Sequence, residues 1–154
     1  MKNQSGFQFS IAGVALVLLI LTTSTKADEE KYGPTQIADA LHEALTAGDQ
    51  EQIFDVIAPD VLIFESGGVE ASREEYASHH MHSDMKFMAG MDREIISRQV
   101  TQDGAMAVVS TSSKLVGSYQ DNQLDLASTE TLVLKKGDHG WRIHHIHWSS
   151  KSNN

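Results

Sequence analysis

The chain contains no cysteine, and this absence excludes two kinds of chemistry. Disulfide bonds cannot stabilise the protein, and no thiol is available as a nucleophile or a metal ligand. A glycine-rich phosphate loop and a Gly-x-Ser-x-Gly motif are also missing, so nothing in the sequence supports phosphoryl transfer or serine hydrolysis. A cysteine-free domain must be held together by packing, to which dimerisation can add.

Basic residues are scarce, with 12 Lys and Arg against 21 Asp and Glu. Strongly acidic surfaces repel nucleic acids and anionic lipids, and they mildly favour cations. We therefore expect no nucleic-acid partner. A small molecule or a metal ion is the expected ligand.

Long apolar runs are limited to residues 11–22, which are 12 in number. A membrane span needs about 20 apolar residues, so this run is short for that purpose. Lys2 precedes it, and the small-x-small pattern Thr25-Lys26-Ala27 follows it, as in a secretory signal peptide. We predict a signal peptide over residues 1–27 and a periplasmic or secreted protein with no membrane attachment after cleavage. The alternative is an uncleaved anchor.

The remaining sequence predicts one domain over residues 35–150, preceded by a flexible leader (28–34) and followed by a tail (151–154). Apolar spacing and turn residues predict helices over 35–47, 50–58 and 72–89, and strands over 60–65, 92–102, 105–118, 123–136 and 140–150. Thr35 can cap the first helix, Pro59 can end the second, and Ser72 with Glu75 forms a capping box for the third. The order of elements predicts an α+β fold with helices on one face of a mostly antiparallel sheet.

The last predicted strand carries three histidines within four positions, His144, His145 and His147. Side chains alternate between the two faces of a strand, so His145 and His147 share a face. Which face meets the interior depends on strand parity, and a bulge would invert it. The alternative to a site is that these histidines pack at a dimer interface.

A second group of histidines lies on the third predicted helix. Tyr76, His80 and Asp84 are four residues apart and therefore share one helical face. A histidine with an aspartate one turn away can act as a base with its orienting partner, and we treat all three as candidate catalytic residues. The alternative is that this face is merely solvated.

If the two groups meet, His79, His80, His145 and His147 could ligate a metal ion. Three or four imidazoles suit zinc or copper, and nearby methionines favour copper. Four further residues are candidate pocket residues. Glu65 and Glu70 flank a glycine turn, Glu130 lies in an otherwise apolar and hydroxyl-bearing strand, and Trp148 shares the last strand. A carboxylate such as Glu130 needs a partner if it is buried.

Residues 35–150 resemble the nuclear transport factor 2-like superfamily, particularly its SnoaL-like and ketosteroid-isomerase-like bacterial branch. The resemblance rests on the order of helices and strands, the turn Glu65-Ser66-Gly67-Gly68, and the ending Gly140-Trp141-Arg142-Ile143-His144-His145-Ile146-His147-Trp148-Ser149. That ending is also similar to the calmodulin-dependent kinase association domain. The resemblance implies a cone-shaped α+β barrel, in which a strongly curved sheet wraps around helices, with a pocket at its open end and a homodimer formed through the sheet.

Superfamily members include isomerases, cyclases, dehydratases and scaffold domains, so the fold does not decide the function. The ketosteroid-isomerase mechanism needs a carboxylate base in an apolar pocket, for which Glu65, Asp84 or Glu130 could serve, and Tyr76 could be a donor. Three hypotheses follow: an exported domain that binds a small ligand or a transition metal, an isomerase, lyase or cyclase with a His/Asp proton-transfer pair, and a dimerising assembly domain without chemistry.

Overall fold

The computed structural model describes residues 32–153. Its helices are α1 (Pro34–Ala47), α2 (Gln50–Val56), α3 (Arg73–His79) and α4 (Met81–Ala89). Its strands are β1 (Ile57–Glu65), β2 (Gly68–Glu70), β3 (Met91–Asp103), β4 (Met106–Tyr119), β5 (Asn122–Gly137) and β6 (Gly140–Ser152). The predicted signal peptide, and the leader before Tyr32, lie outside the described residues. No helix within 32–153 is long and apolar enough to cross a membrane.

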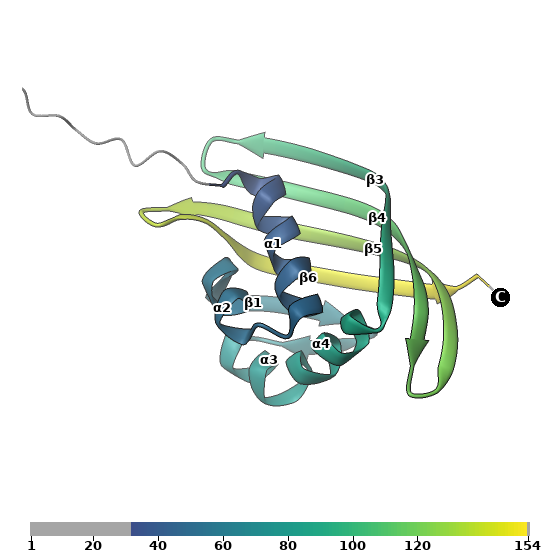
Figure 1. Cartoon of the computed structure of the whole chain (residues 1–154). Helices are drawn as coiled ribbons and strands as arrows, with labels where there is room; N and C mark the ends of the chain where they lie inside the picture. Colours follow the sequence, from purple (N-terminus) through teal and green to yellow (C-terminus); the bar gives the residue numbers. More distant parts are fainter. Residues whose placement is uncertain (1–31, 154) are drawn as a thin grey trace, which may run out of the picture.

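The strands of this region form one six-stranded sheet in the order β2-β1-β6-β5-β4-β3. All neighbouring strands are antiparallel except β1 and β6, which run parallel. The sheet is curved and does not close; α1 lies across one face, and α2, α3 and α4 gather at one end (Figure 1). The predicted α+β architecture is confirmed, with four helices in place of the expected three.

Helix α1 begins one residue before the position expected from Thr35. Gly33 is its N-cap and Pro34 its first residue, a position that proline favours because it has no N–H to leave unpaired. Its apolar positions recur every four residues as predicted, and Ile37, Leu41 and Leu45 are buried in the core.

Strand β1 begins at Ile57, before Pro59, whereas the sequence predicted that helix α2 continues to Ala58. The pairing of β1 with β6 is irregular between Ile57 and Leu62, which is where Pro59 lies. Proline is tolerated there because no regular ladder hydrogen bond requires its missing N–H.

The helix predicted over residues 72–89 is divided at His80 into α3 and α4. Its start is as predicted, because the Glu75 N–H donates to Ser72 Oγ at 3.1 Å. The Glu75 carboxylate accepts from the Ala71 N–H, at 2.7 Å, instead of completing the capping box at Ser72. The predicted tail is also different, since β6 extends to Ser152 and Asn153 donates its N–H to the Asp125 carbonyl.

Glycines allow α4 and β4 to approach each other closely where the chain turns into β3. A Cβ atom added to Gly117 would lie 2.0 Å from the Gly90 carbonyl oxygen and 2.9 Å from Met91 Cα. A Cβ atom on Gly90 would lie 2.4 Å from the Ser118 oxygen. Both contacts are with backbone, so only glycine fits without a shift of the main chain.

A β-bulge in the last strand decides which histidines face the interior. The pairing of β5 with β6 shifts between Val133 and Leu134, and His144 is the extra residue. Ile143 and Ile146 are consequently both buried, although they are three apart. His145 and His147 therefore lie on the opposite face from Ile146 and Trp148.

Candidate functional site

A cavity of about 580 Å³ lies between the concave face of the sheet and the helices. It is large enough for a small organic molecule. One wall carries side chains from the end of β1, from β2 and from α4, and a second wall carries side chains from α1, β3, β4, β5 and β6. Apolar lining between them comes from Leu45, Phe87, Met88, Leu115, Leu126 and Trp148.

The first wall contains a histidine held by a buried glutamate. His80 Nδ1 is hydrogen-bonded to Glu70 Oε1; the Glu70 side chain is 4% exposed and that of His80 58%. The hydrogen bond to Glu70, together with its charge, raises the pKa of His80. The imidazole thus favours its cationic form, and its Nε2–H can donate to a ligand.

Tyr76 and Asp84 lie beside this pair. The buried Tyr76 hydroxyl donates to Asp84 Oδ2 at 2.8 Å. Burial raises the pKa of Asp84, although the hydrogen bond from Tyr76 and the charge of His80 act against the rise. Burial and the Asp84 carboxylate raise the pKa of Tyr76, so the phenol stays protonated.

Glu65 is the carboxylate on this wall that is best suited to proton transfer. Burial raises its pKa to about 6, Asp84 and Glu70 add to the rise, and His80 opposes it. A carboxyl group with a pKa close to neutral pH can both accept and return a proton efficiently.

The second wall is built around Glu130, whose side chain is 4% exposed. His42 Nε2 and Trp148 Nε1 each lie 2.7 Å from Glu130 Oε2. Arg93 Nη2 lies 3.9 Å from Glu130 Oε1. Burial alone would raise the pKa of Glu130, but the hydrogen bond and charge of His42, the hydrogen bond from Trp148 and the charge of Arg93 outweigh it and lower the pKa. Glu130 is therefore ionised, and both nitrogens donate to it.

The structure groups most of the predicted site residues around one cavity. Glu65, Glu70, His80 and Asp84 line the first wall, with Tyr76 beneath Asp84, and Glu130 and Trp148 line the second. The sequence reasoning missed His42 and Arg93. His42 follows the buried Ala38 by four residues on α1, and that spacing could have revealed its inward direction.

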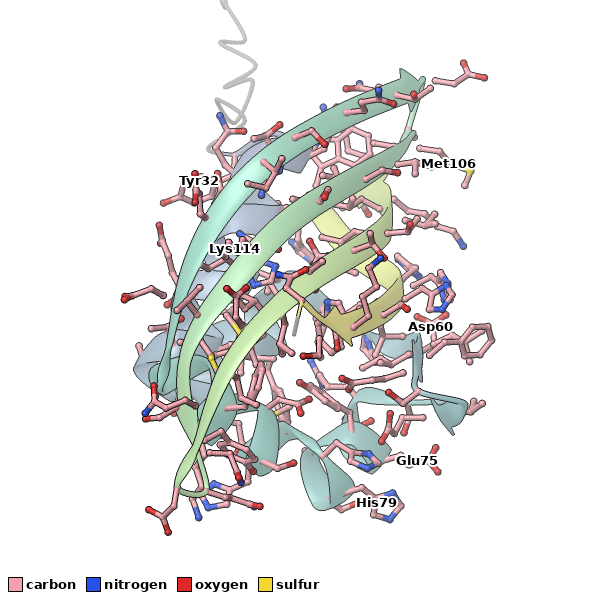
Figure 2. The ribbon with its side chains drawn as sticks, turned by 90° about the vertical axis from the view of Figure 1, so that its right-hand side faces the viewer. Tyr32, Asp60, Glu75, His79, Met106 and Lys114 are labelled. Atoms are coloured by element: carbon pink, nitrogen blue, oxygen red, sulfur yellow. The ribbon has the colours of Figure 1, made fainter. Side chains whose placement is uncertain are left out.

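The four predicted ligand histidines are not brought together. His145 donates to the Leu62 carbonyl at 2.8 Å and contacts the Phe64 ring, away from the cavity. His147 also contacts Phe64, and Figure 2 shows His79 at the periphery, pointing outward. Within residues 32–153, no three His, Cys, Asp or Glu side chains are grouped so that they could hold a metal ion. The bulge at His144 turns His145 and His147 away from the cavity, whereas His79 and His80 lie at the junction of α3 and α4. A copper or zinc ion stays a prediction.

Comparison with known proteins identifies the family. The SnoaL-like domain model matches residues 35–152, and the chain belongs to this family of the nuclear transport factor 2-like superfamily. A candidate ketosteroid isomerase from Shewanella frigidimarina NCIMB 400 is similar in structure, with a TM-score of 0.74 and 34% sequence identity, over 79% of this chain and 98% of the other. No curated protein matches the sequence.

More distant structures share the fold alone. The calmodulin-dependent kinase II hub of S. rosetta has a TM-score of 0.63 and 20% identity, over 78% of this chain and 98% of the other. A candidate dehydratase of the same superfamily from Streptomyces avermitilis has a TM-score of 0.61 and 18% identity, over 76% of this chain and 93% of the other.

Proposed function

We propose that this protein is a small-molecule isomerase that transfers a proton within the cavity, with Glu65 as the base. The observation that carries the proposal is the position of Glu65 in the cavity wall with its pKa raised to about 6. Surface carboxylates titrate near 4, so this group differs from an ordinary one in the direction that general base catalysis needs.

The chemistry follows from the neighbours of Glu65. Ionised Glu65 removes a proton from a carbon next to a carbonyl group, and the electron pair moves onto the carbonyl oxygen. The His80 Nε2–H, held in place by Glu70, donates to that oxygen and stabilises the enolate. If a carbon–carbon double bond adjoins that carbon, Glu65 returns the proton to the far carbon of the double bond. The enolate electrons then re-form the carbonyl group, and the double bond moves into conjugation with it. Asp84, fixed by Tyr76, is a positioning residue that keeps the pKa of Glu65 high.

The similarity to a candidate ketosteroid isomerase supports this reaction class. Homodimerisation and export stay predictions. Hub and association domains among the similar structures are compatible with an oligomer, and the predicted signal peptide with export.

The test uses purified protein and a Δ5-3-ketosteroid, whose conversion to the conjugated enone is followed by ultraviolet absorbance. The proposal predicts turnover that Glu65→Gln reduces by about 10³-fold or more, since it removes the base. The control is Glu43→Gln, an exposed glutamate on α1. Turnover that survives Glu65→Gln unchanged rejects Glu65 as the base. Absence of turnover, and of solvent-deuterium exchange into the ketone, counts against isomerase chemistry.

A further inference from the structure

The second wall of the cavity contains two buried polar atoms that have no hydrogen-bond partner within residues 32–153, His42 Nδ1 and Glu130 Oε1, and the isomerase chemistry above uses neither. Glu130 Oε1 is buried and lacks a hydrogen-bond partner within residues 32–153. The Arg93 guanidinium faces it as a long ion pair at 3.9 Å, and the Arg93 side chain forms no hydrogen bond with residues 32–153. We propose that this wall binds a hydroxyl group of a neutral substrate, which donates to Glu130 Oε1 and accepts from Arg93.

An unsatisfied carboxylate oxygen is costly in this position. The Glu130 side chain is 4% exposed, and its other oxygen already accepts from His42 and Trp148. Buried polar atoms in folded proteins nearly always have a partner, and exceptions point to a ligand, an ion or a water molecule. Since Glu130 is ionised, Oε1 requires a donor.

Arg93 lies beside Glu130 Oε1 and needs a hydrogen-bond acceptor. Its side chain is 13% exposed, and burial lowers its pKa despite the nearby Glu130. A separation of 3.9 Å exceeds the length of a hydrogen bond, so the guanidinium donors are not used by the carboxylate. A hydroxyl group that meets both requirements donates its proton to Glu130 Oε1 and accepts one from the guanidinium.

The same geometry disfavours an anionic ligand. A substrate carboxylate beside Arg93 would also lie beside the ionised Glu130, and like charges in a buried site repel each other strongly. A row of lining serines, Ser113, Ser128 and Ser150, borders the wall and adds hydroxyl partners without charge.

The position of the second wall relative to Glu65 indicates a class of substrate for the proposed isomerase, and this inference rests on that proposed function. Strand β6 lies between β1 and β5, and its residue Trp148 is in register with Glu65 on β1 and with Glu130 on β5. Neighbouring strands are about 4.8 Å apart, so the backbones of Glu65 and Glu130 are separated by roughly 10 Å. Leu115, Leu126 and Trp148 line the space beside them. The substrate is therefore a neutral hydroxylated molecule with an apolar body, whose reactive carbon lies at the end opposite the hydroxyl.

The experiment measures binding rather than turnover. Three probes share one ring system: 2-naphthol donates and accepts, 2-methoxynaphthalene only accepts, and 2-naphthoate is an anion. Calorimetry at neutral pH should show that 2-naphthol binds about tenfold or more tightly than either of the others, as a hydrogen bond to a charged partner provides. Glu130→Gln and Arg93→Met should each reduce this preference to about twofold or less.

Controls separate this proposal from the isomerase reaction. Glu65→Gln should retain the preference for 2-naphthol, so loss of turnover and loss of hydroxyl recognition are distinguishable. Circular dichroism checks that each variant is folded, and Arg93→Gln replaces any variant that is not. Equal affinity for 2-naphthol and 2-methoxynaphthalene, as expected if a water molecule stays between the two groups, overturns the proposal. Tighter binding of 2-naphthoate, or no binding of 2-naphthol, also overturns it.

Discussion

Glu65 and Glu130 lie in one row of the sheet, on either side of Trp148, and their pKa values are shifted in opposite directions. Burial acts to raise both. Glu65 has carboxylates near it and its pKa rises to about 6, whereas Glu130 receives two hydrogen bonds from nitrogen and its pKa falls. Two carboxylates with separated pKa values in one cavity are typical of sites with distinct proton-transfer and binding roles.

The pH dependence of turnover should report Glu65. Because the base must be ionised, kcat/KM should rise with pH and level off with an apparent pKa of about 6. Asp84→Asn should shift this limb to lower pH, because the Asp84 charge raises the pKa of Glu65, and His80→Ala should shift it to higher pH. Steady-state kinetics across pH 4 to 9 check this. Shifts in the same direction for the two variants would contradict the assignment.

Glu65 should also reduce the stability of the folded protein at high pH. Its folded-state pKa of about 6 exceeds the ordinary 4.5, so stability is lost as the pH rises through this interval and Glu65 ionises. The linkage of about 2 kcal/mol is reduced by solvent screening to about 1 kcal/mol. Urea unfolding should therefore show Glu65→Gln to be more stable than wild type by about 1 kcal/mol at pH 8, with no difference at pH 4. If Glu65→Gln were more stable than wild type at pH 4 but not at pH 8, the predicted pH dependence would be contradicted.

The hydrogen bond from Trp148 to Glu130 should stabilise the fold at neutral pH. Trp148→Phe removes one of the two donors to a buried carboxylate and should cost about 1.5 to 3 kcal/mol at pH 7. A carboxylate with a lowered pKa contributes stability above its unfolded pKa and loses it as the pH falls through the folded value, so the cost should shrink at pH 3. Trp141→Phe, in the same strand, is the matched control. Equal costs at both pH values would argue for packing alone.

Gly117 should tolerate no side chain. Gly117→Ala places a Cβ atom against the Gly90 carbonyl and should destabilise the protein by about 1 to 3 kcal/mol, because two backbone segments must separate. Gly137→Ala is the control, since a Cβ atom there meets nothing within 4 Å. Thermal unfolding compares the two. Similar melting temperatures for both variants would show that the backbone segments at Gly117 and Gly90 separate at little cost, which would contradict the prediction.

Much of the fold and part of the site follow from sequence periodicity. The four-residue spacing of Ile37, Leu41 and Leu45 predicts the buried face of α1. The same spacing puts Tyr76 and Asp84 on one face of the predicted helix, and in the structure they are hydrogen-bonded across the break between α3 and α4. The pattern on α1 depends on local geometry alone, so tertiary contacts were not needed to find it.

The remaining features depend on contacts between distant residues. The break at His80 coincides with its bond to Glu70, which lies on the short strand β2 that the sequence did not reveal. The bulge at His144 turned His145 and His147 away from the cavity, and no residue type marks it. Arg93 was missed because a single arginine near the start of a strand usually faces solvent.

The most direct test of the central claim is a carbon-13 NMR titration of the Glu65 side-chain carboxyl, assigned by comparison with Glu65→Gln. A midpoint of about 6 is predicted, moving lower in Asp84→Asn. A midpoint at or below the ordinary 4.5 would show that Glu65 is an unexceptional carboxylate, and the proposed base would be lost.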